Sequence, residues 1–470
     1  MKKVMITLLI AATFLTGSAQ DIGKVDLKKM DIKDKVDKLV KAYIDLDIFS
    51  GVVLIAQDGD PYYHQAFGLA NREKNIPNTL TTKFDIGSMN KAFTKVVILQ
   101  LVEAGKLKLS DKLGEYLEGF PENVATQVTI DQLLNHTSGF GDYHTPGFFE
   151  APRSEKTIEA ITKHARTMPL MFAPGSDNSY SNTGYILLGA VIEKITGKSY
   201  HENVKKRIIQ PLNLKDTYVE NKDQVPNRSI GYFKDIKGHI QDNEGFLEIP
   251  NPDGGFQSTT TDILTFYREF HYGNQLLKEK TKQLDESWQF METHRNTGGA
   301  IPHAGGFNGA NTVLYEVLRD KISVLVFANM DEPVAEQLGV GILAIIRGKV
   351  PNQPSLPASQ NVYQALQEHG TNYVKENFEA LTTNFHPSDP RDFILNAIGY
   401  DLLSSGETDE AIQIFEFNTE LFPEVANVWD SLGEAWLKKG DKKKALKYYK
   451  KALSIQPGLP SAKEAVARLE

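Results

Sequence analysis

The feature that most constrains the fold of this 470-residue chain is a repeat of 34 residues in its C-terminal part. The positions that recur at this spacing are Gly399 and Gly433, Gly406 and Gly440, Ala411 and Ala445, Phe415 and Tyr449, and Pro423 and Pro457. A unit of this length holds two helices that cannot bury their apolar faces alone, so neighbouring units must stack. The sequence therefore predicts an all-α region with clear repeats at about 392–425 and 426–459.

The second copy also matches a known repeat family. Its pattern residues are Trp429, Leu432, Gly433, Trp436, Ala445, Tyr449, Ala452 and Pro457. In this set it resembles the tetratricopeptide (TPR) repeat position for position, while the first copy departs from the pattern at Leu395 and Asn418. The resemblance implies a region that docks a protein partner; an ordinary helical hairpin is the alternative. Because two repeats rarely stand alone, residues 362–381 are a candidate for a further, degenerate helical pair.

Changes in amino-acid composition along the chain mark the predicted domain boundaries. A proline-rich stretch precedes the repeats, and a charged segment precedes the first strong apolar pattern. The predicted organisation is a signal peptide at 1–19, a linker at 20–35, a globular domain at 36–350, a Pro-rich linker at 351–358 and a helical TPR-like domain at 359–470.

The first nineteen residues have the layout of a secretory signal. Lys2 and Lys3 precede an apolar run that is too short to span a bilayer, and small residues follow at 17–19. The sequence has no cysteine, which excludes a lipid-modified leader, disulfides and thiolate catalysis. We expect an exported bacterial protein, periplasmic or secreted, without a membrane span after processing.

Charge and apolar content bound the class of function. A formal charge of -8 argues against general binding of nucleic acid or anionic membranes. The lysines of the last repeat are interpreted as a solvated helix face. Hydrophobic residues make up 41% of the chain, which is enough for an ordinary globular core.

The globular region has strand patterns at both ends. Residues 49–56 and 62–69 flank an Asp58-Gly59 turn, and 312–317 and 322–329 form a second hairpin pattern. Helical patterns lie between the two hairpins. The economical arrangement is one antiparallel sheet flanked by helices with a helical insertion, an α+β fold.

A serine and a lysine mark the strongest candidate for chemistry. Ser88 is followed by Lys91 just before an apolar helical run from Val96 to Val102. Side chains three apart share a helix face, and the helix N-terminus lends positive potential to the serine oxygen. A serine hydroxyl needs a base, and a lysine can serve when its surroundings favour proton release. On its own the pattern is also that of a helix N-cap.

Two later clusters supply complementary groups. The Tyr180 phenol could move protons between Ser88 and a leaving group, and the Asn182 amide could hold both a lysine and a substrate carbonyl. Each could equally be ordinary packing ahead of a helix. Further on, His303, Gly305 and Gly306 precede a strand, where glycines allow close approach of substrate to backbone.

Together these clusters resemble one enzyme family. The ordered motifs are Ser88-x-x-Lys91, Tyr180-x-Asn182 and His303-x-Gly305, supported by the stretches Leu133–Gly139, Tyr180–Gly189 and Gly254–Asp262. They look like the motifs of class C serine β-lactamases and of the related penicillin-binding DD-peptidases, D-aminopeptidases and esterases. The resemblance covers roughly residues 36–350. His136, within the first supporting stretch, is interpreted as a structural loop residue rather than a catalyst.

The resemblance implies a role for each motif residue. Ser88 is the acylated nucleophile, Lys91 and Tyr180 share acid/base work, and Asn182 positions the substrate amide. The amides of Ser88 and Gly306 form the oxyanion hole, and His303 lines the site beside the edge strand. β-Lactamases usually carry lysine in place of His303, so the histidine is more similar to the DD-peptidase and esterase branches.

The sequence thus predicts an exported serine hydrolase that forms an acyl-enzyme on Ser88, without metal or cofactor. Its expected substrates are D-amino-acid peptides, cell-wall-like peptides or small esters, with β-lactams as a further candidate class, and its TPR tail binds a protein. No G-x-S-x-G elbow or H-E-x-x-H pattern occurs in the sequence. The alternative hypothesis is a hydrolase-derived scaffold whose catalysis is dispensable and whose repeats do the work.

Overall fold

The computed structural model describes residues 24–144, 148, 151–246, 249–331, 333–383 and 391–470. The predicted signal peptide lies outside the described residues. The chain forms two compact units: the first runs to residue 233 and from 242 to 354, and the second comprises residues 234–241 and 355–470. Among the described residues, no helix has the length and apolar character needed to cross a membrane.

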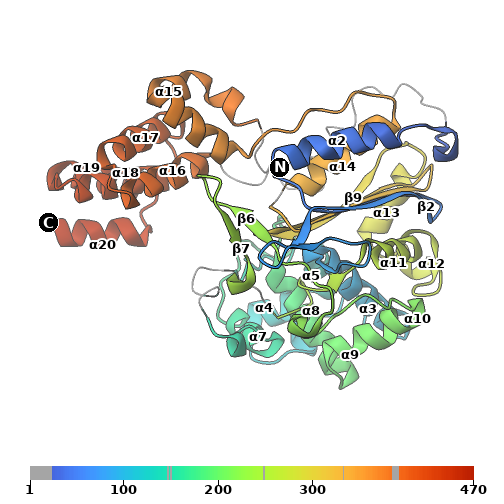
Figure 1. The fold of residues 1–470 in the computed structure, drawn as a ribbon. Helices are drawn as coiled ribbons and strands as arrows, with labels where there is room; N and C mark the ends of the chain where they lie inside the picture. Colours follow the sequence, from blue (N-terminus) through green and yellow to red (C-terminus); the bar gives the residue numbers. More distant parts are fainter. Residues whose placement is uncertain (1–23, 145–147, 149–150, 247–248, 332, 384–390) are drawn as a thin grey trace. The chain divides into compact units, whose positions relative to one another are not determined.

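A five-stranded antiparallel sheet organises the first unit (Figure 1). Its order is β2-β1-β11-β10-β9, with bounds β1 Gly51–Gln57, β2 Asp60–Phe67, β9 Ile301–Phe307, β10 Ala310–Val317 and β11 Ile322–Ala328. The N-terminal and C-terminal hairpins join where Leu54 of β1 lies opposite Leu325 of β11. This confirms the predicted single sheet. The structure adds a fifth strand, β9, at an open edge, and this strand contains His303, Gly305 and Gly306, which the sequence pattern places ahead of a strand; their glycines hide the strand signal.

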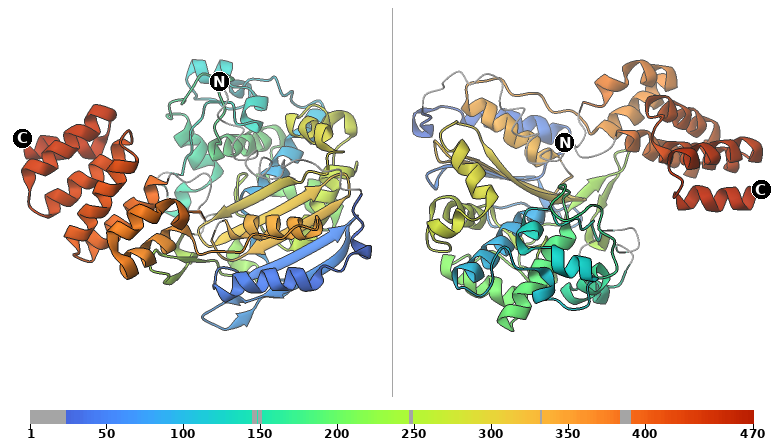
Figure 2. Two further views of the ribbon diagram at one scale, coloured as in Figure 1. Left: turned by 90° about the horizontal axis from the view of Figure 1, so that it is seen from above. Right: turned by 180° about the vertical axis from the view of Figure 1, so that it is seen from behind.

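Helices cover both faces of this sheet (Figures 1 and 2). Helices α2 (Lys33–Asp45) and α14 (Val334–Ile346) lie on one face, and α11 (Thr260–Tyr272) packs against the other. Strands β10 and β11 are buried along their whole length because apolar residues face both layers. The main core lies between the sheet and the helices on the α11 side, which also carry the candidate site.

The remaining elements that precede β9 are mostly short, and β6 and β7 each have residues in both units. Their bounds are η1 Leu27–Lys29, β3 Leu69–Asn71, β4 Ile76–Pro77, β5 Phe84–Asp85, η2 Gly87–Asn90, α3 Lys91–Glu103, η3 Leu113–Glu115, α4 Glu122–Gln127, α5 Ile130–Leu134, η4 Arg153–Glu155, α7 Ile158–Ala165, α8 Asn182–Thr196, α9 Tyr200–Val204, η5 Lys205–Ile209, α10 Gln210–Leu212, η6 Lys222–Gln224, β6 Tyr232–Lys234, β7 Ile240–Asp242, η7 Glu244–Phe246, β8 Gln257–Ser258, α12 Glu279–Lys282 and α13 Glu286–His294.

The segment interpreted as a linker at 20–35 is packed where the structure describes it. Leu27 is fully buried, and its N–H donates to the side chain of Gln57 on β1 at 2.8 Å. Ile32 is also buried, and α2 already begins at Lys33. The charges of this segment stay at the surface while isolated apolar residues anchor it, a pattern too sparse to show as a periodic signal.

The second unit is a stack of helices. Their bounds are α15 Ala358–Leu381, α16 Asp392–Ser404, α17 Thr408–Leu421, α18 Ala426–Lys438, α19 Lys442–Ile455 and α20 Pro460–Leu469. Helix α15 is broken at Gly370 (φ 76°, ψ 176°), so it supplies the additional helical pair anticipated for this region. The repeated pair Gly399 and Gly433 sits where helices cross, since a Cβ at Gly399 would meet the Phe415 ring at 2.5 Å and one at Gly433 would meet the Tyr449 ring at 3.0 Å. Residues 234–241 belong to this unit, and Lys237 pairs with Asp401.

Candidate active site

Ser88 lies in the short 3-10 turn Gly87–Asn90, which joins β5 to α3. The α-helix itself begins three residues later, at Lys91, so Ser88 precedes it. Side chains three residues apart nearly eclipse in a 3-10 turn. As the spacing predicts, Lys91 Nζ lies 3.0 Å from Ser88 Oγ. Gly87 gives the turn its left-handed residue, with φ of +49°, and its N–H donates to Asp85.

Lys91 is buried and ringed by acceptors. Besides Ser88 Oγ, its Nζ donates to Asn182 Oδ1 and to the Asp253 carbonyl oxygen, both at 2.6 Å. Nζ also lies 4.9 Å from the centroid of the Tyr180 ring and 5.5 Å from that of Tyr185. Three acceptors and two aromatic faces are the surroundings that an ammonium group prefers.

Tyr180 reaches the same serine from another part of the chain. Its hydroxyl donates to Ser88 Oγ at 2.7 Å across 92 residues of sequence. The Tyr180 ring is 44% exposed, so its outer side is open to solvent and to an incoming molecule. Ser88 Oγ thus accepts from the Tyr180 hydroxyl and lies beside the Lys91 amino group, the two titratable groups through which its proton can leave.

Asn182 completes this cluster as the first residue of α8. While its Oδ1 accepts from Lys91, its Nδ2 donates to Asp142 Oδ2 at 2.8 Å and lies 3.1 Å from His144 Nδ1. The amide therefore holds the lysine as expected. Its nitrogen, which the amide chemistry also allowed to meet a substrate carbonyl, is already engaged by the 142–144 segment.

The glycines of β9 press against the turn that carries Ser88. A Cβ at Gly305 would lie 2.2 Å from the Ile86 carbonyl oxygen and 2.6 Å from Ser88 N. A Cβ at Gly87 would likewise lie 2.6 Å from Gly306 N. The amides of Ser88 and Gly306 are therefore in adjacent backbone segments, on the open edge of the sheet. Two N–H groups so placed can bind one developing oxyanion.

His303 occupies the same strand but bonds elsewhere. Its Nε2 lies 3.1 Å from Nε2 of His271 on α11, and its ring packs against Tyr267 at 4.4 Å between centroids. Burial, reinforced by the charge of Lys95, lowers the pKa of His303 to about 3. His303 therefore presents no fixed positive charge near neutral pH, and its hydrogen bond is to His271 rather than to the Ser88–Lys91–Tyr180 cluster.

Two residues that contact the site were not predicted from the sequence. Asp142 and Asp253 bind the side chains of Asn182 and Lys91 but carry no motif of their own. His136, interpreted as structural, stacks on Tyr180 with ring centroids 4.6 Å apart. The sequence signal that could have pointed to Asp142 is its position at the end of the largely polar loop that follows His136.

Buried charge near the site is compensated. Lys95, one turn after Lys91, pairs with Asp285 at 2.9 Å. Burial alone would raise the pKa of Asp285, but Lys95 and Ser287 outweigh it and lower the pKa. For His136, burial followed by the charges of Lys91 and Lys95 lowers the pKa to about 3, so its ring is neutral.

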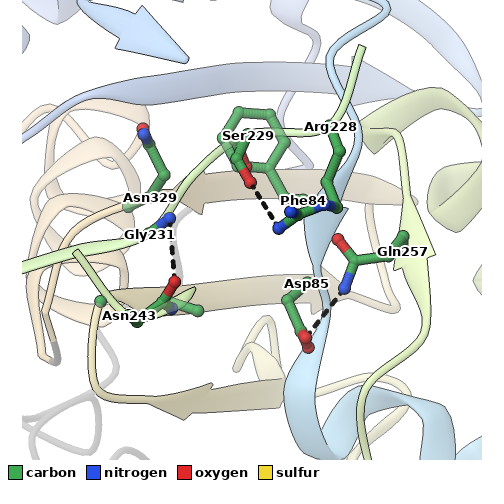
Figure 3. A pocket seen from close by; sticks show the side chains of 11 residues that line it. Phe84, Asp85, Arg228, Ser229, Gly231, Asn243, Gln257 and Asn329 are labelled. Atoms are coloured by element: carbon green, nitrogen blue, oxygen red, sulfur yellow. Dashed lines mark hydrogen bonds between the residues drawn. The ribbon is translucent and has the colours of Figure 1, made fainter. Parts of the chain in front are cut away.

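A small cavity beside β5 is lined by Asp85, Arg228 and Gln257 among others, and its lining does not include the catalytic residues (Figure 3). This cavity of about 10 Å³ is room for about one water molecule. Asp85 and Gln257 meet at its wall through a 2.8 Å hydrogen bond, and Asp85 also holds the Gly87 N–H. The residues that line this cavity therefore help to hold the Gly87–Asn90 turn in place. Within the described parts of the chain, no group of three or more His, Asp or Glu side chains is arranged to hold a metal.

Comparison with known proteins agrees with this geometry. A family model described as beta-lactamase matches residues 36–340, and a tetratricopeptide repeat model matches 426–459. Penicillin-binding protein 4* of Bacillus subtilis is 29% identical over 347 residues, which cover 66% of this chain and 75% of that protein.

Solved structures show the same fold. A penicillin-binding protein from Bacillus halodurans matches with a TM-score of 0.57 and 26% identity, over 66% of this chain and 99% of that one. The D-amino acid amidase of Ochrobactrum anthropi matches with a TM-score of 0.57 and 20% identity, over 67% and 98% of the two chains. The chain therefore belongs to the β-lactamase family of serine hydrolases, and it carries a tetratricopeptide repeat in its C-terminal helical unit.

Proposed function

We propose that this protein hydrolyses an amide or ester bond through an acyl-enzyme on Ser88. The observation that carries the proposal is the position of Ser88 Oγ, 3.0 Å from Lys91 Nζ and 2.7 Å from the Tyr180 hydroxyl. These distances bring the expected nucleophile and its acid/base partners together without rearrangement.

The chemistry follows from these contacts. Ser88 Oγ attacks the carbonyl carbon while its proton passes to the Lys91–Tyr180 pair, which acts as the base in the form that has already released one proton, and the amides of Ser88 and Gly306 bind the oxyanion. The same pair then protonates the leaving nitrogen or oxygen as its bond to carbon breaks. Water repeats the sequence on the ester and releases the acid product together with free Ser88. Asn182 holds Lys91 throughout.

We propose that the substrates are D-amino-acid or cell-wall-like peptides or small esters. His303 supports this choice, because a neutral histidine paired with His271 gives little attraction to the carboxylate that β-lactams carry. The name of the B. subtilis relative keeps penicillin as a probe. The signal-like residues 1–19 support export, which would place the enzyme beside cell-wall peptides.

Intact-mass spectrometry tests the proposal. Wild-type protein and Ser88→Ala would be incubated separately with a fluorophosphonate and a fluorescent penicillin, with the exposed-site variant Ser154→Ala as a matched control. We expect one fluorophosphonate adduct on wild type and on Ser154→Ala, and none on Ser88→Ala. A lasting penicillin adduct would indicate a DD-peptidase, and labelling by fluorophosphonate alone an esterase or amidase. Equal behaviour of wild type and Ser88→Ala with both probes and across ester, D-amino-acid amide and β-lactam substrates would refute the hydrolase.

We also propose that the helical unit docks a protein partner. Support comes from the repeat family matched at 426–459 and from the additional helical pair of α15. In a pull-down, deletion of residues 358–470 should remove partner capture. If Ser88→Ala leaves the cellular phenotype intact while this deletion abolishes it, the scaffold alternative is favoured. Capture that survives the deletion would contradict the docking role.

A further inference from the structure

The loop from residue 135 to 144, defined here as the anchor loop, contacts each residue of the Tyr180-Ser181-Asn182 motif. The ring of His136 stacks on that of Tyr180, and His136 Nδ1 accepts the Ser181 N–H at 3.2 Å. Ser181 Oγ donates to the Gly141 carbonyl oxygen at 3.0 Å. The second motif is therefore held, residue by residue, by a segment some forty residues earlier in the chain.

The contacts at Asn182 are the most specific. Asp142 Oδ2 accepts both the backbone N–H of Asn182, at 3.1 Å, and its side-chain Nδ2–H, at 2.8 Å. The other oxygen of Asp142 lies 2.9 Å from His144 Nδ1. Burial opposes ionisation of Asp142, but the hydrogen bonds from His144 and from the Asn182 backbone outweigh it and lower the pKa to about 2. Asp142 is therefore an acceptor, and never a donor, at neutral pH.

An acceptor at this place determines which way the Asn182 amide faces. An asparagine amide has a donor end and an acceptor end of nearly the same shape. With the donor end on Asp142, the acceptor end faces Lys91 Nζ at 2.6 Å. The reversed amide would set an NH2 group against the lysine ammonium and an oxygen against the Asp142 carboxylate, which is unfavourable at both ends.

We propose that Asp142 is a positioning residue for the hydrolysis: it fixes the orientation of the Asn182 amide and, through it, the place of Lys91 beside Ser88. This inference rests on the proposed function. Asp142 does not touch Ser88, Lys91 or a substrate in this role. His136, in the same loop, holds the Tyr180 ring. The anchor loop therefore positions both Tyr180 and Asn182.

The first experiment replaces the acceptor by an isosteric amide. Asp142→Asn would be compared with wild type and with Asp177→Asn, an exposed aspartate in the segment just ahead of the motif. The readout is the second-order rate of fluorophosphonate labelling of Ser88 together with kcat and KM on one ester. We expect about a tenfold or larger loss in labelling rate and in kcat for Asp142→Asn, because the charged acceptor is replaced by an amide that can present either an oxygen or an NH2 group to Asn182, so the orientation of Asn182 is no longer fixed. The KM of Asp142→Asn should stay close to that of wild type. Asp177→Asn should keep the labelling rate, kcat and KM of wild type. An unchanged labelling rate for Asp142→Asn would overturn the proposal.

The second experiment asks whether Asp142 acts through Asn182. In a double-mutant cycle, Asp142→Asn should cost much less in an Asn182→Ala background than in wild type. Equal and independent costs would contradict a positioning role and would indicate a general effect on folding. Thermal unfolding of each variant distinguishes a positioning role from a general effect on folding. Loss of a positioning residue lowers the labelling rate by more than the loss of stability explains.

A charge-exchange variant keeps the test decisive if Asp142→Asn folds poorly. Asn182→Asp alone places two carboxylates together, which should slow labelling and lower stability. Combined with Asp142→Asn, the introduced amide can donate to the introduced carboxylate, whose other oxygen still accepts from Lys91. We expect the pair to label faster than Asn182→Asp alone, and absence of this rescue counts against the proposal. Wild-type labelling that is not abolished by Ser88→Ala would instead refute the proposed function itself.

Discussion

At the scale of single residues, Gly305 shows how little room separates β9 from the nucleophile. A Cβ there would lie within 2.8 Å of three backbone atoms of the 86–89 turn, and backbone cannot move aside as a side chain can. We expect Gly305→Ala to displace Ser88 and slow fluorophosphonate labelling on the order of a hundredfold. Gly245→Ala, whose Cβ would meet nothing within 4 Å, is the control. Equal labelling of the two variants would show that the turn tolerates displacement.

His303 leads to a prediction about acid stability. Its pKa is about 3 when folded, against an ordinary value of 6.5. Between these pH values the unfolded chain binds a proton that folded His303 does not, so stability falls as pH decreases through this window. Between pH 6.5 and 5, His303→Gln should lose about 2 kcal/mol less than wild type.

Urea unfolding of the two proteins at both pH values measures this difference. The comparison with wild type matters because buried Glu316, whose pKa burial raises to about 7, contributes an opposite slope that both proteins share. His164→Gln, at an exposed site, should leave the pH dependence as it is. An identical pH dependence in His303→Gln and wild type would contradict the lowered pKa of His303.

At the scale of elements, α8 is capped by a residue that also belongs to the active-site motif. Ser181 Oγ accepts the Gly184 N–H at 3.1 Å and donates to Gly141 in the anchor loop. Ser199 caps α9 in the same way, accepting the Glu202 N–H at 3.1 Å. Loss of either cap should cost about 1 kcal/mol of stability.

The two caps should differ in their effect on activity. We expect Ser181→Ala to reduce the labelling rate of Ser88 several-fold beyond Ser199→Ala, because only the first cap ties the motif to the anchor loop. Thermal unfolding and labelling kinetics measured on the same samples check this. Parallel losses of stability and of labelling rate in both variants would mean that the anchor loop adds nothing to catalysis.

At the scale of the whole molecule, the helical unit has a core of its own. Phe415 packs against Gly399, where α16 and α17 cross, and belongs to a cluster made almost wholly of residues from 358 onwards. We expect Gly399→Ala to destabilise this unit by about 1–3 kcal/mol through overpacking, without changing the labelling rate of Ser88. Gly458→Ala, with no atom within 4 Å of its Cβ, is the control. Differential scanning calorimetry measures the stability of the helical unit, and labelling kinetics measure the reactivity of Ser88. A loss of labelling in Gly399→Ala would show that the two units are coupled.

Local patterns were enough to predict the elements and the fold class. Strands β1 and β11 follow from apolar runs beside turn residues, and the 34-residue period follows from helices that need neighbours. The relation between Ser88 and Lys91 is local as well, because one turn of 3-10 helix connects them. The resemblance to a known family connected the three motifs into one predicted site. The predicted fold and family are confirmed.

The strands, the helices, the repeat and the closeness of Ser88 and Lys91 depend on residues that are neighbours along the chain. Three-dimensional packing was needed to bring the Tyr180 hydroxyl to Ser88, to place Asp142 where it accepts from Asn182, and to pair His303 with His271. These contacts join residues separated by 32 to 92 positions. No periodic pattern encodes such pairs, because they arise when separately formed elements are packed against one sheet and their buried polar groups must find partners.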